Sequence, residues 1–392
     1  MKIIFLTMVP FSQRDYDRLG VEIIKEHKIA VECWDMTEML NNKVWKQRKM
    51  EAFKFSGYIG VSSMGLIKKM CENIGDAIVI DLLGPGLTCN WVRRLIKKTS
   101  AKTCVSELGL TASDVFRGGG GRHKINLERM VIKFKVYGIF SFFKSAMAVV
   151  CEKRRPEVSY RLMSGTASLA RQDSHLINAQ KIWAHSFDYN SILPLRNQEI
   201  CKDTIVFIDT GINGSNPDFS MFSVKRFVTK KKYHISMVRV FSILEKYFNA
   251  SVIIAGHPKV NYEKEPYPFG QREVQTGKTA ELIRDCKIVV SHGSTADSFA
   301  VLWRKPLLLI TTNEIESSVQ KGYLDAEADL LRTQPINADD CLDTVDWSSI
   351  SQRPIVNYDN YRNKLIKKDG TPEKNSWMIL IDFLKREKEN HE

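Results

Sequence analysis

Short apolar runs alternate with amphipathic, helix-forming segments along most of this 392-residue chain. In the second half, the apolar runs are "TIVFIDTG", "ASVIIAGHPK", "KIVVSHGSTA" and "PLLLITTNE". Each is rich in aliphatic residues, each is separated from the next by a helical pattern, and each ends in small or polar residues, which is typical of parallel strands with crossover helices. The first half repeats this rhythm from "KIIFLTMVP" to "DAIVIDLLGPG". The sequence therefore predicts an α/β fold.

The length and one polar loop predict two domains. A chain of 392 residues is too long for one ordinary domain and allows two separate cores. The loop "LPLRNQEICKD" precedes a fresh apolar strand, so the boundary is expected near residue 200, between a domain of residues 1–200 and one of residues 201–392. The amphipathic segment "SWMILIDFLKRE" is expected to pack back on the first domain.

The charge balance favours an anionic partner. The chain has 58 Lys and Arg against 45 Asp and Glu, a net charge of +13, which suits nucleotide phosphates, an acidic glycan, nucleic acid or an anionic membrane. No interleaved aromatic and basic motif of the kind that reads bases is present, so nucleic acid is the less favoured partner. Eight scattered cysteines without a Cys-x-x-Cys pair, and no cleavable signal, indicate a cytoplasmic protein.

Two basic segments leave alternatives open. Residues 136–155, "VYGIFSFFKSAMAVVCEKRR", are too interrupted by charge to cross a membrane, and they indicate either a core helix with a basic end or a surface that binds anionic lipid. Residues 116–124, "FRGGGGRHK", indicate either a mobile surface loop or a lid that closes over a phosphate or carboxylate.

Three strand ends in the second half carry side chains suited to chemistry. Asp209 ends "TIVFID", and the Thr-Gly that follows it is expected to turn the chain away and leave the carboxylate exposed. His257 ends "ASVIIAGH", and Ser294 with Thr295 follows "KIVVSHG". Pro258 stops its strand, because proline has no backbone donor for the sheet. Parallel strands bring their carboxyl ends to one edge, where ligands of open α/β sheets bind. Ser294 and Thr295 open a helix, where they serve as a simple cap or contact an anion.

These residues resemble a known group of enzymes. Bacterial sialyltransferases and Kdo transferases of GT-B architecture, which use CMP-activated acidic sugars, carry an acidic-x-Gly, a His-Pro and a Ser-Ser or Ser-Thr motif in this order. Here "DTG", "HP" and "ST" match them. The run over residues 204–314 is most similar to the bacterial β-Kdo transferases, down to "H-x-S-T-x-x-x-F-A" and "KP". One departure is that their tandem acidic pair is Ile208 and Asp209 here.

The resemblance implies a fold, a reaction and a donor site. It implies two Rossmann-like domains facing across a cleft, and transfer of Kdo from CMP-Kdo to a glycan or lipid-linked glycan of lipopolysaccharide, O-antigen or capsule. Asp209 would be the nucleophile of a retaining, β-forming reaction or the base of an inverting one. No cofactor or metal is expected, so protein donors must meet the charge of the leaving CMP. The residues proposed for that site are His257, Lys259, Ser294 and Thr295 for the phosphate and Glu314 for the ribose.

The acceptor side is expected in the first domain. Its candidates are Glu157, Ser164, Gly165, His185 and Asp188, each of which also fits an ordinary loop or cap position. Glu157 or Asp218 is a further candidate for part of the catalytic role of Asp209. Three other functions remain open: an inverting sialyltransferase, a CDP-glycerol-type transferase and a basic nucleic-acid-binding protein. A protein of the leading kind would lie in the cytoplasm, peripherally at the inner face of the membrane.

Overall fold

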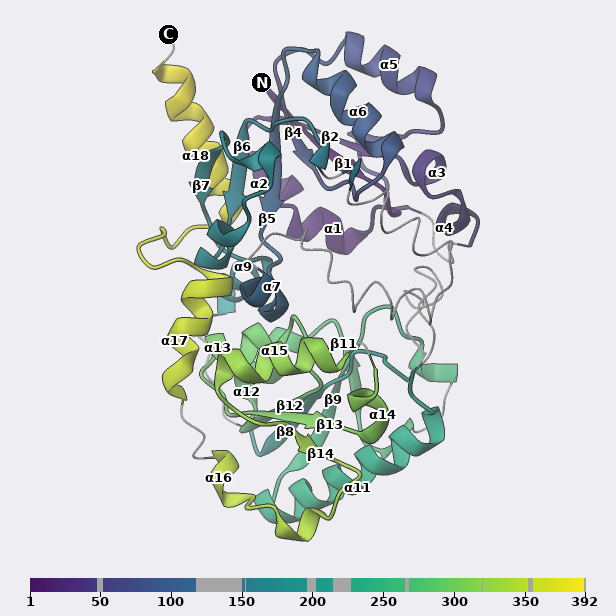
Figure 1. The fold of residues 1–392 in the computed structure, drawn as a ribbon, viewed down its shortest axis with the longest axis vertical. Coiled ribbons are helices and arrows are strands. Elements are labelled where there is room, and N and C mark those ends of the chain that lie inside the picture. Colours follow the sequence, from purple (N-terminus) through teal and green to yellow (C-terminus); the bar gives the residue numbers. More distant parts are fainter. Residues whose placement is uncertain are drawn as a thin grey trace. The chain divides into compact units, whose positions relative to one another are not determined.

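The structure is a computed structural model, and it describes residues 1–47, 52–117, 150–151, 153–195, 202–213, 227–264, 268–318, 320–351 and 355–390. The chain divides into two compact units (Figure 1). Unit 1 consists of Met1–Gly109, Arg117–Phe187 and Lys368–Glu392, and unit 2 consists of Leu110–Phe116 and Asp188–Lys367. The expected boundary at residue 200 lies outside the described residues, as do most of residues 116–124 and 136–155.

Unit 1 contains a seven-stranded sheet in the order β3-β2-β1-β4-β5-β6-β7, and every strand pair is parallel. This is the strand order of a Rossmann-like, doubly wound sheet with one strand added. The strands are β1 (Lys2–Thr7), β2 (Ala30–Asp35), β3 (Tyr58–Gly60), β4 (Ala77–Asp81), β5 (Lys102–Glu107), β6 (Tyr160–Met163) and β7 (Gln180–Trp183).

Both faces of this sheet are covered, which explains why the central strands β1 and β4 are nearly continuous apolar runs. Along β1, Ile3 and Phe5 join one buried cluster, with α2 (Val21–Glu26) and α18 (Ser376–Glu389). Ile4 and Leu6 join the cluster on the other face, with α5 (Met64–Glu72) and α6 (Leu87–Lys97). Unit 1 also contains α1 (Gln13–Arg18), α3 (Thr37–Leu40), α4 (Asn42–Gln47) and short 3₁₀ turns at Thr166–Ala170 and Ser174–Leu176. Helix α7 (Ala112–Arg117) is assigned to unit 2 except for its last residue, Arg117.

The C-terminal helix α18 belongs to unit 1. The Trp377 ring meets Phe5 edge to face, with centroids 5.4 Å apart, and its Nε1 donates to the carbonyl of Arg18 at 2.8 Å. Gly20 has a φ of +60°, and a Cβ there would lie 2.3 Å from Trp377 Cδ1, so only glycine allows this approach. Burial of the tryptophan fixes the helix on the sheet.

Unit 2 contains a six-stranded parallel sheet in the order β11-β9-β8-β12-β13-β14. Its strands are β8 (Thr204–Ile208), β9 (Ser251–Gly256), β11 (Val274–Thr276), β12 (Ile288–Ser291), β13 (Leu307–Thr311) and β14 (Ile336–Asn337), with β10 (Pro268–Gln271) outside this order. Successive strands are added outward from β8, first through β9 and β11 and then on the other side from β12 onward. The strand order therefore reverses between β8 and β12.

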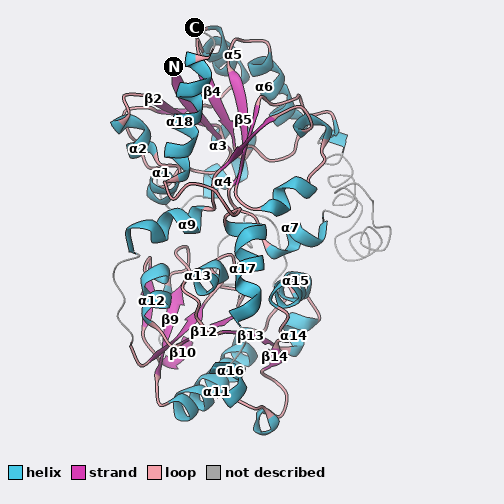
Figure 2. Ribbon diagram, turned by 90° about the vertical axis from the view of Figure 1, so that its left-hand side faces the viewer, coloured by secondary structure: helices cyan, strands magenta, loops and turns pink. Residues whose placement is uncertain are grey.

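Helices cover the sheet of unit 2 (Figure 2). The longest is α11 (Lys230–Phe248), whose apolar residues recur at helical spacing and whose Phe241 ring lies 5.0 Å from that of Phe207 on β8. It ends at Asn249, which has a left-handed backbone with φ of +46°. The remaining helices of unit 2 are α12 (Thr279–Asp285), α13 (Asp297–Leu302), α14 (Asn313–Glu316), α15 (Lys321–Leu331), α16 (Ser348–Ser351), α17 (Tyr358–Tyr361) and α9 (Phe187–Ile192), whose first residue is assigned to unit 1.

The predicted α/β fold with two Rossmann-like sheets is confirmed by these two parallel sheets. Within the described ranges, no helix is both long enough and apolar enough to cross a membrane.

Candidate functional site at the carboxyl edge of the second sheet

The candidate site is formed by the loops that follow three neighbouring strands of unit 2. Asp209 follows β8, His257 follows β9, and the loop that carries Ser294 and Thr295 follows β12. Because β9, β8 and β12 are adjacent and parallel, these loops emerge at one edge of the sheet. That edge includes the reversal point between β8 and β12, where open α/β sheets bind their ligands.

Asp209 is held on both carboxylate oxygens. The backbone nitrogen of Gly211 donates to Oδ1 at 2.9 Å, and the hydroxyl of Tyr262 donates to Oδ2 at 2.7 Å. Gly211 has a φ of +66°, which glycine adopts without strain and which turns the chain back toward the carboxylate. The sequence predicts an exposed Asp209, but its exposed fraction is 2%, so this expectation is wrong. The turn folds over the side chain instead of leading away from it.

His257 is oriented by the turn that Pro258 begins. The backbone nitrogen of Val260 donates to the His257 carbonyl at 3.0 Å, and that of Lys259 donates to the imidazole Nδ1 at 3.2 Å. An Nδ1 that accepts a hydrogen bond leaves the hydrogen of the neutral ring on Nε2. His257 is half-buried, and Lys259 is exposed. The strand end therefore presents a hydrogen-bond donor and an ammonium group together.

The loop after β12 is held by its own side chains. Ser294 Oγ accepts from the Ala296 nitrogen at 3.2 Å, and Asp297 Oδ2 accepts from the Ser294 nitrogen at 2.9 Å. Thr295 is exposed, whereas Ser294 is half-buried. Ser294 thus stabilises the turn into α13, and Thr295 is the hydroxyl of this pair that faces solvent.

Two buried carboxyl groups lie behind this loop, and sequence reasoning did not find them. Asp297 is fully buried and Glu327 on α15 is 4% exposed. Burial raises the pKa of Asp297 to about 7, against the hydrogen bond from the Ser294 nitrogen that lowers it. Burial and the nearby charge of Asp297 hold the pKa of Glu327 well above its usual range. At neutral pH this pair retains at least one proton. In sequence, Asp297 looks like a plain residue of a helical first turn.

His292, next to the Ser-Thr loop, is structural. Its Nδ1 donates to the Ile310 carbonyl at 2.7 Å, and its Nε2 accepts from the hydroxyl of Tyr233 at 3.0 Å. Burial lowers the pKa of His292 to about 4, so the ring is neutral. The contact ties β12 to α11 and to β13.

Glu314, predicted to hold a ribose, has a structural contact. It lies in the first turn of α14, and its Oε2 accepts from the backbone nitrogen of Thr229 at 2.7 Å. Thr229 immediately precedes α11, so Glu314 stabilises the start of that helix. One carboxylate oxygen is engaged in this way, and the side chain is half-buried.

The acceptor-side residues predicted for the first half lie in different places. Ser164 and Gly165 follow β6, and His185 follows β7, so these three are near one sheet edge of unit 1. Glu157 precedes β6 and bonds to Asn178 Nδ2 at 3.2 Å, which places it at the opposite edge. Asp188 belongs to unit 2, where it accepts from Ser298 Oγ at 2.6 Å.

Ser164 and His185 make structural contacts. Both are fully buried. Ser164 Oγ donates to the Glu107 carbonyl at 3.0 Å, and Ser376 Oγ lies 2.9 Å from His185 Nδ1 and donates to the His185 carbonyl at 2.8 Å. Ser376 begins α18, so His185 fastens this helix at the end of β7.

Buried ion pairs also lie at the carboxyl ends of strands in unit 1. Glu107 on β5 pairs with Arg161 at 2.9 Å and with Arg171 at 2.5 Å. Asp81 on β4 pairs with Arg93 and Arg155, each at 2.7 Å. Burial raises the pKa of Asp81, but the two guanidinium groups outweigh it and hold the pKa below its usual range. These pairs stabilise the loops that follow the strands.

Arg155 corrects one expectation about the basic segment. Its side chain is 8% exposed because its guanidinium is paired with Asp81, so it does not face a membrane. Lys153 and Arg154 are exposed, and Lys144 lies outside the described residues.

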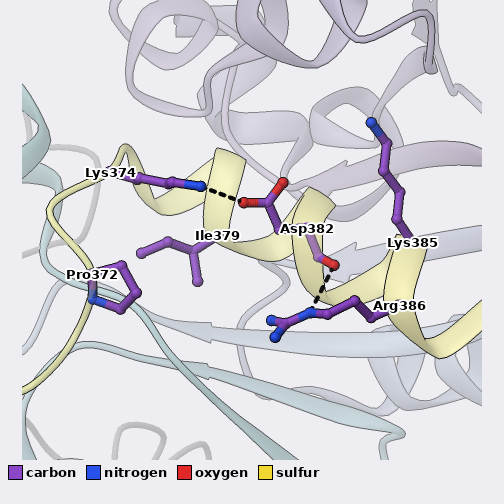
Figure 3. Close-up of a pocket in the computed structure, with 6 residues that line it drawn as sticks. All are labelled: Pro372, Lys374, Ile379, Asp382, Lys385 and Arg386. Carbon is purple, nitrogen blue, oxygen red and sulfur yellow. Dashed lines mark hydrogen bonds and ion pairs between the residues drawn. The ribbon is translucent and has the colours of Figure 1, made fainter.

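A groove of about 480 Å³ lies along α18 in unit 1 (Figure 3). The Lys374 ammonium pairs with Asp382 at 3.0 Å, and Lys385 and Arg386 are exposed on the same helix. All of its lining residues belong to unit 1, and none of them is a residue of the candidate site.

Comparisons with known proteins identify the fold. No protein-family model matches the chain, and no curated protein sequence matches it. Among solved structures, the wall teichoic acid polymerase TagF, solved with CDPG, superposes with a TM-score of 0.55 at 11% identity, covering 100% of this chain and 90% of that chain. The Arabidopsis thaliana glycosyltransferase UGT89C1 gives 0.49 at 10% identity over 98% of each chain. UDP-GlcNAc 2-epimerase from Methanocaldococcus jannaschii gives 0.47 at 9%, over 98% of this chain and 100% of that one.

The likeness to TagF and the two parallel sheets define the class of fold. The chain has a GT-B-like α/β fold with two Rossmann-like units. At 11% identity the likeness concerns the fold alone, so the reaction must be argued from the residues of the site.

Proposed function

We propose that this protein transfers a group from a cytidine-activated donor with release of CMP, and that the group is Kdo, taken from CMP-Kdo. The observation that carries the proposal is the arrangement of His257 beside Asp209 at the carboxyl edge of the second sheet. The order of "DTG", "HP" and "ST" along the chain supports the acidic-sugar donor.

The site residues suit the departure of CMP. When the bond to the sugar breaks, the phosphate of CMP gains negative charge, which needs donors already in place. His257 offers its Nε2 hydrogen, Lys259 offers an ammonium, and Thr295 offers an exposed hydroxyl. Ser294 supports this set by fixing the turn next to Thr295.

Asp209 is the proposed nucleophile of a retaining reaction. Its carboxylate would form a bond to the anomeric carbon of Kdo as the bond from that carbon to the CMP oxygen breaks. The acceptor oxygen would then bond to the anomeric carbon as the bond to Asp209 breaks, its proton would pass to solvent water, and two inversions give net retention. Because Oδ2 accepts from Tyr262, the attacking electron pair must come from a lone pair that this hydrogen bond does not occupy, or the bond must break first.

The acceptor is proposed to be a cell-surface glycan or lipid-linked glycan. The proposed acceptor side is the sheet edge of unit 1 where β6 and β7 end. Ser164 and His185 are buried at that edge, so they would hold its loops in place and not touch the acceptor themselves. The net charge of +13 and the exposed Lys153 and Arg154 support a cytoplasmic protein that works at an anionic membrane surface.

A second candidate is transfer of glycerol phosphate from CDP-glycerol. The observation that favours it is the superposition on TagF, which was solved with CDPG. Both donors contain cytidine and release CMP, so the phosphate-binding groups around His257 serve either reaction. They differ in that Kdo carries a carboxylate and CDP-glycerol carries a second phosphate.

Donor screening tests these candidates. The purified chain is incubated with CMP-Kdo, CMP-sialic acid or CDP-glycerol and a short synthetic glycan acceptor, and released CMP is measured. Release with CMP-Kdo alone, with a β-linked Kdo product in mass spectra and proton NMR, supports the proposal. Release only with CDP-glycerol moves the assignment to the second candidate. No CMP release, together with a salt-dependent gel shift that CMP does not compete, would favour nucleic-acid binding instead.

A further inference from the structure

Tyr262 joins the two loops that carry Asp209 and His257. Its hydroxyl donates to Asp209 Oδ2 at 2.7 Å and accepts from the backbone nitrogen of His257 at 2.7 Å. One oxygen atom therefore bridges the end of β8 to the end of β9. Sequence reasoning did not single out Tyr262, which lies five residues beyond His257 in the turn Tyr262–Lys264.

The ring of Tyr262 is placed by a glycine. A Cβ on Gly256 would lie 2.8 Å from Tyr262 Cε2, closer than real Cβ atoms approach other atoms. It would also lie 2.9 Å from Val274 and 3.0 Å from Thr276, so Gly256 leaves room where the ring meets β11. This close packing fixes the hydroxyl and limits the positions that the loop after β9 adopts.

The hydroxyl remains a donor under working conditions. Burial, the negative charge of Asp209 and the hydrogen bond to it raise the pKa of Tyr262 far above its usual value. The phenol is therefore protonated, and its single hydrogen goes to Asp209. Its lone pair is then available to the His257 amide, which suits the two observed distances.

We propose that Tyr262 is a positioning residue that holds the imidazole of His257 in a fixed position relative to Asp209. The inference rests on the proposed function, because it assigns Tyr262 to the same site. The hydroxyl fixes the His257 backbone, and the turn from His257 to Val260 then fixes the ring through the Lys259 nitrogen on Nδ1. Without the hydroxyl, the His257 amide loses its acceptor and the turn loosens. The Lys259 nitrogen then no longer holds Nδ1 as an acceptor, so the ring is not restricted to the tautomer with its hydrogen on Nε2.

The test compares Tyr262→Phe with a matched variant. Tyr262→Phe keeps the ring against Gly256 and removes only the hydroxyl. Tyr358→Phe is the control, because in the same unit it removes a hydroxyl that donates to the Lys305 carbonyl at 2.7 Å. Thermal unfolding shows that each variant is folded. Labelling with [¹⁵N]histidine gives amide and ring signals from only 8 residues, and loss of one set in His257→Asn assigns those of His257.

The first readout uses the protein without substrate. In Tyr262→Phe, we expect the His257 amide to exchange with solvent at least ~10-fold faster, since its acceptor is gone. The ring nitrogen shifts are expected to change from one dominant Nε2-protonated form to a mixture of tautomers. Tyr358→Phe should leave both measurements as in the parent chain. Unchanged exchange and tautomer in Tyr262→Phe would overturn the proposal.

The second readout is CMP release from the donor identified by screening. We expect Tyr262→Phe to lower kcat by ~10-fold with KM changed less than twofold, because the hydroxyl orients a group that acts in the transition state. Normal kcat despite a loosened His257 would also overturn the positioning role. If the parent chain releases CMP from none of the donors, the proposed function fails. The exchange and tautomer measurements alone then decide whether Tyr262 positions His257.

Discussion

The backbone nitrogen of Ser294 donates a hydrogen bond of 2.9 Å to Oδ2 of Asp297, so a fully buried carboxyl group supports the loop of the candidate site. The other oxygen of Asp297 has no hydrogen-bond partner among the described residues. A proton on that oxygen removes the cost of a buried charge. The conformation of this loop is therefore linked to the protonation of the pair that Asp297 forms with Glu327.

This linkage predicts that unit 2 loses stability as the pH rises toward 7. The pKa of Asp297 is raised to about 7 in the folded chain, above its value in the unfolded chain. The folded state then binds more protons than the unfolded state, and its stability falls by at least about 1.4 kcal/mol per pH unit between about pH 5 and about pH 7. The fall continues above pH 7, because the raised pKa of Glu327 keeps a proton on the pair there. The effect is measured by unfolding the chain in urea at each pH and monitoring the unfolding by hydrogen exchange of peptides from α13.

A matched pair of variants isolates this contribution. Asp297→Asn keeps an acceptor for the Ser294 nitrogen but has no carboxyl proton, so its stability relative to the parent chain should rise with pH over this range. Asp325→Asn on α15 changes an exposed carboxylate paired with Lys321 and serves as the control. A constant difference between Asp297→Asn and the parent chain from pH 5 to 8 would contradict the raised pKa.

Replacement of His257 is predicted to impair turnover without unfolding the chain. His257→Ala should lower CMP release at least ~100-fold, because one donor that stabilises transition-state charge contributes about 2.7–4 kcal/mol. His257→Asn retains an acceptor for the Lys259 nitrogen and so preserves the turn, but it lacks the Nε2 hydrogen. Both variants should therefore be equally inactive. Near-normal release by a folded His257→Asn would exclude the imidazole as the donor.

Arg155 and Lys153 are predicted to differ in their effect on stability. Arg155→Met removes a buried partner of Asp81, and since Arg93 still pairs with that carboxylate, the expected loss is about 2 kcal/mol, below the 3–5 kcal/mol of an isolated buried pair. Lys153→Met changes an exposed side chain and should alter stability by less than about 0.5 kcal/mol. Thermal unfolding measures both. Equal effects would show that the pair with Asp81 adds nothing.

Membrane binding is predicted to depend on the exposed residues of this segment. Lys153→Ala with Arg154→Ala should weaken flotation with anionic vesicles, at about 1 kcal/mol per residue, while neutral vesicles should not bind the parent chain. The measurement is made at low salt, where screening is weakest. If the parent chain fails to float with anionic vesicles even then, the basic residues have another role.

The sequence is sufficient to predict the strands of the sheets, because each strand is recognised from a short run of neighbouring aliphatic residues. The aliphatic runs of β8, β9, β12 and β13 appear in the sequence as strands, and the side chains that end them lie at one edge as the parallel topology requires. The order of strands was not predicted, since it depends on contacts between segments far apart in the chain.

The partners of the site residues could not be predicted from the sequence for the same reason. Tyr262 reaches Asp209 across 53 positions, and Glu327 lies 30 positions from Asp297, so no short motif contains either pair. The sequence also predicts too high an exposure for two charged side chains. Asp209 and Arg155 are polar residues next to apolar runs, which indicates a surface position, but each is buried against a partner supplied by another segment.

The final prediction concerns Asp209 as the nucleophile. Incubation with CMP-Kdo and no acceptor should leave a Kdo-sized adduct, detected by intact-protein and peptide mass spectrometry on the peptide that contains Asp209. Before the reaction, the Asp209 carboxylate accepts hydrogen bonds from Tyr262 and Gly211, which stabilise its charge and lower its reactivity. Removing the Tyr262 hydroxyl makes Oδ2 more reactive but loosens His257, which stabilises the departing CMP. Tyr262→Phe should therefore still form the adduct, but more slowly than the parent chain, with CMP released at the same slower rate.

Asp209→Asn controls for adduct formation elsewhere, since it keeps the size of the side chain and removes the nucleophile. It should form no adduct and lower turnover at least ~100-fold. An α-linked product with no adduct in the parent chain would assign Asp209 the role of a general base in an inverting reaction. That outcome would agree with the 2% exposure of Asp209, because a base can act through a bridging water, whereas a nucleophile must touch the sugar. The stereochemistry of the product thus distinguishes the two roles.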